Sequence, residues 1–216
     1  MHHTFKKNCN TYMTDSEQIR LDKIADTDYD IFTLIEQRYS PRIFKKDTIT
    51  ESHLNKLFEA VRWSASSNNM QPWRFIYAAK GSKEYLSILD CLSDFNKKWA
   101  NNAPLLLLTV YKEKTDDGKE NFHALHDLGL CLGNMTMQAQ YLGIALHHMA
   151  GVDWEKAQII FGVPQGFHIS TAIAVGYYGG NLNNLPEDLR QQETAQRKRM
   201  PFKNFAFKGT WKETDV

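Results

Sequence analysis

The sequence lacks an excess of charge of either sign. Its 216 residues include 26 Lys and Arg against 25 Asp and Glu, so the formal net charge is 26 − 25 = +1. Proteins that bind nucleic acid or an anionic membrane surface usually carry a marked positive excess. The charge balance therefore argues against both classes of partner.

Long hydrophobic runs are also lacking. The strongest run, 105–111, is far shorter than the about 20 residues that a membrane-spanning helix needs. The first residues, MHHTFKKNCNTYMTDSEQ, contain no apolar central segment of the secretory type. We therefore expect no membrane span and a location in the cytoplasm.

Cysteine is scarce, and the glycine-rich nucleotide-binding motifs are absent. Cys9, Cys91 and Cys131 are an odd number of cysteines without CxxC spacing, which does not predict a disulfide framework or a zinc site. We interpret Cys91 and Cys131, which lie in apolar helical contexts, as buried thiols. There is no G-x-G-x-x-G and no G-x-x-x-x-G-K-[ST], so a Rossmann or P-loop site is disfavoured.

The remaining composition suits one sizeable core. A folded chain of this length buries roughly 70% of the surface that its unfolded form exposes. Residues 1–26 are polar and aperiodic, and we expect a flexible N-terminal arm there. No repeat or linker interrupts residues 27–216, which we interpret as a single domain.

Hydrophobic periodicity predicts alternating helices and strands. A capping box at Thr27 and Asp30 predicts a first helix that ends before Pro41, and Thr50 caps a second helix that ends at Trp63. Further helices are expected at 84–92 and 120–142 and between Asp153 and Gly162, with strands at 75–79, 105–111, 144–149 and 171–176. This pattern alone leaves α/β and α+β folds open.

Three polar motifs could bind a ligand. Arg38-Tyr39-Ser40-Pro41-Arg42 places two guanidinium groups and a hydroxyl beside a helix end, and such groups bind phosphate or carboxylate. The loop from Ser66 to Trp73 offers hydroxyl and amide groups that suit a planar heterocycle. Arg197-Lys198-Arg199-Met200-Pro201 carries a local charge of +3. Taken singly, a solvated basic turn, a structural loop and a solvated or targeting patch are the respective alternatives.

Together and in this order, the three motifs resemble the FMN-dependent nitroreductase family. That family has R-x-S-x-R/K after its first core helix, (P/A)-S-x-x-N-x-Q-P-W after its second, and K/R-x-R-x-P near its carboxyl end. The resemblance covers about residues 28 to 211. It implies an α+β fold with a mixed, largely antiparallel sheet flanked by helices, and an intertwined homodimer with two FMN sites at its interface.

The resemblance also implies a set of residues that bind FMN. They are Arg38, Tyr39, Ser40, Arg42, Ser66, Ser67, Asn69, Gln71, Ala150, Gly151, Arg197 and Arg199. Arg38, Arg197 and Arg199 would bind the phosphate, and Arg42 would lie at the pyrimidine edge of the ring, where positive charge stabilises the anionic reduced flavin. The loop from Ser66 to Gln71 would come from the partner subunit, and Ala150-Gly151 would lie against the reactive ring nitrogen.

The implied function is a two-electron oxidoreductase with a ping-pong mechanism. NADH or NADPH would deliver hydride to FMN and leave, and a small acceptor such as a nitroaromatic or quinone would then enter the same site. Because flavin carries the redox chemistry, no catalytic side chain is expected. Three alternatives stay open: a family member acting on an enone or halogenated aromatic, a flavin-binding module without turnover, and a nucleic-acid-binding or adaptor protein that uses the basic patch at Arg197-Lys198-Arg199.

Two histidine pairs have more than one interpretation. His123, His126 and Asp127 have i, i+3, i+4 spacing that could present metal ligands, but no second cluster completes a metal site, so we expect none. Of His147 and His148, which point to opposite faces of a strand, one could approach the flavin. A hydrogen-bonded core histidine is the alternative.

Overall fold

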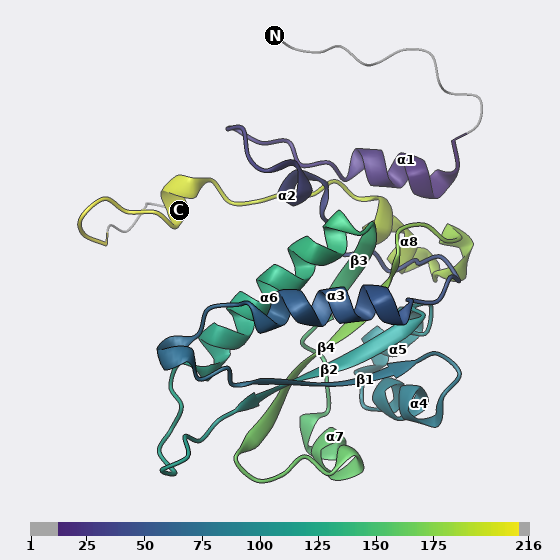
Figure 1. Cartoon of the computed structure of the whole chain (residues 1–216). Coiled ribbons are helices and arrows are strands. Elements are labelled where there is room, and N and C mark those ends of the chain that lie inside the picture. The colour runs from purple at the N-terminus through teal and green to yellow at the C-terminus, as the bar shows by residue number, and fades with distance from the viewer. Residues whose placement is uncertain (1–12, 212–216) are drawn as a thin grey trace.

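A four-stranded antiparallel sheet forms the centre of the protein (Figure 1). The computed structural model describes residues 13–211. The strands are β1 (Trp73–Ala79), β2 (Leu105–Lys112), β3 (Ile144–Met149) and β4 (Phe167–Tyr177), in the spatial order β1-β2-β4-β3. Every pairing between neighbours is antiparallel. The fold is therefore α+β, as the family resemblance implied.

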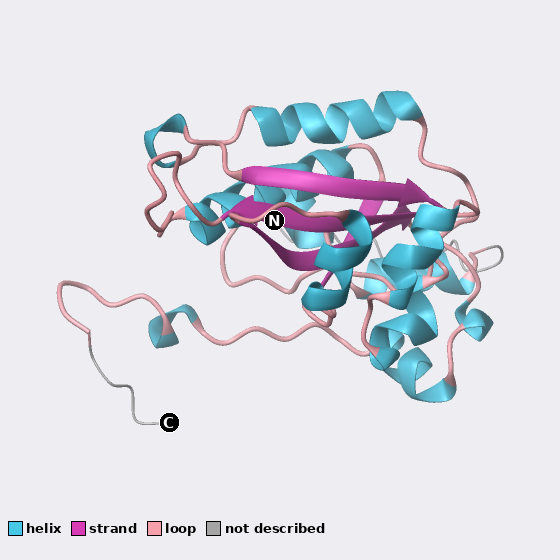
Figure 2. Ribbon diagram, turned by 90° about the horizontal axis from the view of Figure 1, so that it is seen from below, coloured by secondary structure: helices cyan, strands magenta, loops and turns pink. Residues whose placement is uncertain are grey.

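Helices cover both faces of this sheet (Figures 1 and 2). On one face, Leu105 and Leu107 of β2 share a core with α3 (Glu51–Arg62) and α6 (Ala124–Tyr141). On the other face, Leu106 and Leu108 share a core with α4 (Lys83–Asp90), α5 (Asp94–Ala100) and α7 (Trp154–Phe161). Successive side chains of a strand point to opposite faces, so a strand covered twice needs an unbroken apolar run.

Local capping signals predicted several helix ends correctly. The Thr50 hydroxyl accepts a hydrogen bond from the amide of His53 at 3.2 Å, and the Asp153 carboxylate accepts one from the amide of Lys156 at 3.1 Å. Gly162 ends α7 in the left-handed conformation, with φ of 60°. These three predictions are confirmed.

The helix expected to start at Thr27 is much shorter than predicted. Helix α2 spans Thr33–Gln37, and its N-cap is Phe32. Ile31 and Ile35, which the prediction placed on an apolar stripe, are exposed. Without a buried stripe, a capping box does not offset the cost of starting a helix.

An additional helix, α1 (Asp15–Asp22), lies within the segment expected to be a flexible arm. Thr14 and Glu17 form a capping box, in which the Thr14 amide donates to the Glu17 carboxylate at 2.9 Å. Ile19 of α1 is buried in a core with Leu189 of α8 (Glu187–Thr194). Ile19 is the one buried residue of α1, and its burial anchors a helix whose sequence is largely polar. The rest of the arm up to residue 12, with Cys9, lies outside the described residues.

Helix α6 is buried on one side only. Leu128, Cys131, Met135 and Ala139 face the sheet, whereas Leu125 and Tyr141 are exposed. Within residues 13–211, neither α6 nor any other helix has the length and apolar character needed to cross a bilayer. The predicted burial of Cys91 and Cys131 is confirmed, and burial raises the pKa of the Cys131 thiol to about 12.

Candidate functional site

The Arg38–Arg42 motif forms an extended turn directly after α2. Arg38 is the C-cap residue of α2, and its backbone is extended. Its guanidinium donates to the Ser40 hydroxyl at 3.2 Å. The Tyr39 side chain is buried in the core, where its ring lies 5.2 Å from that of Tyr178. The structure therefore brings Arg38 and Ser40 together and buries the Tyr39 side chain in the core.

Arg197 of the C-terminal segment reaches the same region. After α8 the chain passes α2 (Figure 1) and then runs outward. The Arg197 guanidinium donates to the carbonyls of Lys23 and Glu36 at 2.9 and 2.7 Å, which places it at α2. Arg197 and Glu36, which are 161 positions apart in the sequence, thus meet at one end of α2.

These arginines and Arg199 form a cluster of like charge. Burial lowers the pKa of Arg38 and of Arg197, and the neighbouring positive charge of Arg199 lowers both further. Among residues 13–211, no carboxylate lies within ion-pair distance of Arg38, Arg197 or Arg199. Cations that repel one another and lack an acidic partner favour an anionic ligand, and a phosphate suits the planar guanidinium donors. We call Arg38, Arg197 and Arg199 the arginine cluster.

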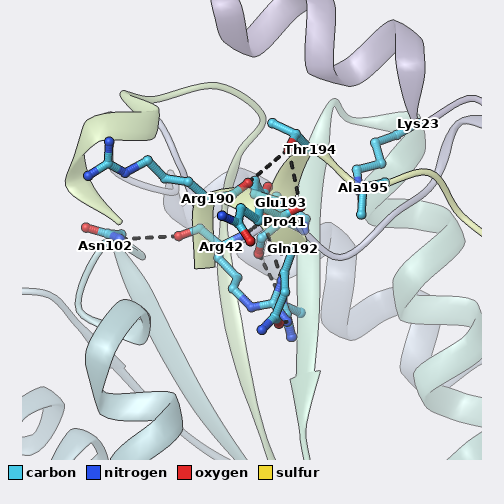
Figure 3. A network of polar contacts seen from close by, with 11 residues as sticks. Lys23, Pro41, Arg42, Asn102, Arg190, Gln192, Glu193, Thr194 and Ala195 are labelled. Atoms are coloured by element: carbon cyan, nitrogen blue, oxygen red, sulfur yellow. Dashed lines mark hydrogen bonds and ion pairs between the residues drawn. The ribbon is translucent and has the colours of Figure 1, made fainter. Parts of the chain in front are cut away.

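Arg42 has a different environment because it is paired with Glu193 of α8 (Figure 3). The Arg42 amide donates to the Glu193 carboxylate at 3.1 Å, and a guanidinium nitrogen lies 3.7 Å from the same oxygen. The guanidinium also donates to the Gln192 side-chain carbonyl at 3.2 Å. It faces the rings of Phe95 and Trp99 at 6.0 and 5.9 Å. Sequence reasoning identified Arg42 but missed Glu193.

Two neighbouring histidines of β3 lie on opposite faces of the strand, and one of them, His147, supports the Arg38–Arg42 turn. His147 Nδ1 lies 2.9 Å from the Pro41 carbonyl oxygen, and its ring lies 4.2 Å from that of Trp99. His148 Nε2 lies 3.2 Å from the Thr136 hydroxyl. Burial lowers the pKa of each imidazole to about 4, so both are neutral at pH 7. Both histidines are hydrogen-bonded, which agrees with the alternative of a hydrogen-bonded core histidine, but only His147 contacts the turn.

Ala150 and Gly151 follow these histidines at the end of β3. The Gly151 carbonyl accepts hydrogen bonds from the Ser93 amide at 2.9 Å and from the Asn96 side chain at 3.2 Å. A Cβ added to Gly151 would lie 2.5 Å from the Ser93 hydroxyl oxygen. Glycine is therefore required by the close approach of the segment that starts α5. Through β3 and α5, Ala150-Gly151 is linked to the turn that carries Arg42.

The loop from Ser66 to Gln71 is held by its own polar groups and by α6. Asn69 and Gln71 have φ of 55° and 46°, a left-handed conformation that asparagine tolerates best among non-glycine residues. The Gln71 amide donates to the Ser66 hydroxyl at 3.1 Å, and the Ser67 amide donates to the Asp127 carboxylate at 3.1 Å. The Asp127 side chain is 1% exposed. Asp127 thus anchors this loop, a role that sequence reasoning missed when it grouped Asp127 with His123 and His126.

The predicted site residues form two separate groups within one chain. The loop contacts Asp127 in the first turn of α6, whereas Gln140 near the end of α6 lies beside Gln37, directly before Arg38. At 1.5 Å per residue, the helix between these two contacts is about 20 Å long. One group comprises the Arg38–Arg42 turn, Arg197 and the Ala150-Gly151 strand end, and the loop from Ser66 to Gln71 is the other.

Comparison with known proteins identifies the family. Residues 35–177 match the Nitroreductase family, so the chain belongs to that family. A solved structure described as an oxidoreductase containing FMN is 30% identical, with a TM-score of 0.81, over 88% of this chain and 96% of that one. A putative NADH oxidase from Clostridium acetobutylicum has the same fold, with a TM-score of 0.61 and 21% identity over 82% of this chain and 99% of its own.

A sequence relative comes from Mycolicibacterium smegmatis. It is an uncharacterized 15.4 kDa protein in the ask 5' region, and it is 28% identical over 145 residues, which are 64% of this chain and 97% of that protein.

Proposed function

We propose that this protein is an FMN-dependent oxidoreductase that transfers hydride from NADH or NADPH to a nitroaromatic, a quinone or a similar small acceptor. The observation that carries the proposal is the arginine cluster, in which Arg38 and Arg197 converge on one end of α2 and have no acidic partner within the described part of the chain, 13–211. Family membership and the similarity to an oxidoreductase containing FMN support the same cofactor.

The residues present fit the chemistry of FMN. Arg38, Arg197 and Arg199 would hold the phosphate, whose negative charge relieves the repulsion among them. Ser40 lies within hydrogen-bond distance of Arg38 and would donate to the ribityl-phosphate. When bound, FMN supplies the two-electron chemistry, accepting hydride from the nicotinamide and passing it to the acceptor. The Ala150-Gly151 backbone would orient the flavin ring. The position of this backbone is fixed by the hydrogen bond from the Asn96 side chain of α5 to the Gly151 carbonyl.

The second group of predicted residues points to a homodimer. The loop from Ser66 to Gln71 lies at the opposite end of α6 from the arginine cluster. We infer that this loop completes the flavin site of a second copy of the chain.

An exposed apolar face is available for that contact. A groove of about 500 Å³ runs between α2, α3 and α6, and Trp63 and Tyr141 in its lining are 74% and 72% exposed. Exposed aromatic side chains gathered around a groove are typical of protein interfaces. Sedimentation of the purified protein as a monomer at micromolar concentration would contradict the dimer.

The redox proposal is tested on the purified protein. We expect a flavin absorption spectrum, either directly or after reconstitution with FMN. Under anaerobic conditions NADH or NADPH should bleach that spectrum, and a quinone or nitroaromatic should restore it. Bound FMN that stays oxidised with both nicotinamides would favour a flavin-binding module without turnover. A protein that cannot be loaded with FMN would refute the proposal.

A further inference from the structure

Glu193 is a buried carboxylate that the proposed function does not use. Its side chain is 1% exposed, although it lies in the last turn of α8. Carboxylates are disfavoured at that end of a helix because the backbone carbonyls place partial negative charge there. Burial raises the pKa of Glu193, in opposition to the neighbouring Arg42 and Lys23. The position is therefore costly for a charged group on two independent grounds.

Glu193 makes few of the bonds that would offset this cost. One carboxylate oxygen accepts the Arg42 amide and lies 3.7 Å from the guanidinium, which is long for an ion pair. Among the described residues, the other Glu193 oxygen and the Arg42 Nε are buried without a hydrogen-bond partner. Buried ion pairs with incomplete hydrogen bonding seldom stabilise a fold relative to apolar residues. Stability therefore gives no reason for an acid at this position.

The surroundings of Arg42 suggest what the acid does. The guanidinium contacts Gln192 and Glu193 (Figure 3). It also faces the rings of Phe95 and Trp99. The backbone of Arg42 is fixed as well. The Asn102 side chain donates to the Arg42 carbonyl at 3.3 Å, and the His147 ring nitrogen lies 2.9 Å from the Pro41 carbonyl oxygen. Glu193 is the only carboxylate paired with Arg42 within residues 13–211.

We propose that Glu193 is a positioning residue for the flavin: it orients the Arg42 guanidinium and partly cancels its charge, which weakens the preference of the site for reduced FMN. This inference rests on the proposed function and on the place at the pyrimidine edge of the ring that the family resemblance implies for Arg42. Reduced FMN carries more negative charge there than oxidised FMN. An uncompensated Arg42 would therefore bind the reduced form more tightly, and Glu193 limits that effect.

The test is the two-electron midpoint potential of bound FMN in the Glu193→Gln variant. Glutamine retains an oxygen that can accept the Arg42 amide and removes the negative charge. We expect the variant to bind reduced FMN, relative to oxidised FMN, at least tenfold more tightly than the wild type does. A tenfold change corresponds to a rise of about 30 mV in the potential. A merely structural role for Glu193 would lower stability without moving the potential.

The matched control is Glu187→Gln on the same helix. Glu187 is a carboxylate with a 70% exposed side chain that pairs with Arg190 at 3.3 Å. This change removes the same charge from α8 away from Arg42, and the potential should equal that of the wild type. An unchanged potential in Glu193→Gln with FMN bound overturns the inference, as does an equal rise in the control.

A second variant covers a failure of Glu193→Gln to fold. Arg42→Gln removes the cation and keeps the backbone amide that donates to Glu193. This variant should lower the midpoint potential of bound FMN, because the positive charge at the pyrimidine edge of the ring is lost. An unchanged potential in this variant also overturns the inference. If wild-type protein does not bind FMN at all, the proposed function fails, and that outcome is distinct from every result above.

Discussion

Replacing His148 with glutamine should make the protein less sensitive to acid. The imidazole is held between β3 and α6 by the Thr136 hydroxyl, and burial together with the nearby Arg38 lowers its pKa from 6.5 to about 4. The folded protein therefore binds fewer protons than the unfolded chain between these two pH values. The stability that neutral His148 contributes is complete above about pH 6.5 and is lost as the pH falls toward 4.

The size of the effect follows from the two pKa values. At pH 5 the unfolded imidazole is almost fully protonated and the folded one almost fully neutral. Linkage then predicts that lowering the pH from 7 to 5 reduces the free energy of unfolding by about 2 kcal/mol through His148 alone. Each variant is compared with itself at the two pH values, so any loss of packing at pH 7 cancels.

Urea unfolding of FMN-free protein at pH 7 and pH 5 measures this difference. The wild type should lose about 2 kcal/mol more than His148→Gln over this interval. His123→Gln, which changes an exposed histidine, should behave as the wild type does. Equal losses in the wild type and His148→Gln would refute the argument that burial keeps this imidazole neutral.

Two further substitutions test the supports of the site. Asp127→Ala removes the buried acceptor of the Ser67 amide and should cost about 1–3 kcal/mol of unfolding free energy; unaltered urea unfolding would contradict the anchoring role. Gly151→Ala places a Cβ 2.5 Å from the Ser93 hydroxyl oxygen and should cost about 1–3 kcal/mol, as overpacking does. Gly133→Ala in α6, where a Cβ meets nothing within 4 Å, should instead stabilise the helix by about 1 kcal/mol. Thermal unfolding that ranks these two glycine variants in the opposite order would count against the close approach at α5.

The strands and most helix ends could be predicted because their signals are local. The apolar run 105–111 corresponds to β2, and Thr50 and Asp153 cap the helices that follow them. Helices α5 and α8 were not predicted, because each is short and polar and is buried through few side chains. Weak signals were present: the hydroxyl of Ser93 caps α5, and two acidic residues follow Pro186 at the start of α8.

The candidate site could be predicted only in part. The cationic residues carry their own signal, since R-x-S-x-R and K/R-x-R-x-P are recognisable as short motifs. The buried carboxylates that hold the site have no such sequence signal. Glu193 is 151 positions from Arg42, and Asp127 is 60 positions from Ser67. From the sequence alone, a carboxylate in a helix is expected to face solvent. Only the structure reveals that Glu193 and Asp127 are buried acceptors.

The central claim is that the arginine cluster binds the phosphate of FMN, and a comparison of FMN with riboflavin tests it most directly. The two flavins share the ring and the ribityl chain, and only FMN carries the phosphate. Charge-assisted contacts contribute about 1.5–3 kcal/mol each, so FMN should bind the flavin-free protein at least about 100-fold more tightly than riboflavin does. Arg199→Ala should narrow this ratio, while Lys203→Ala in the same segment should leave it unchanged. Equal affinities for FMN and riboflavin in the wild-type protein would contradict the account.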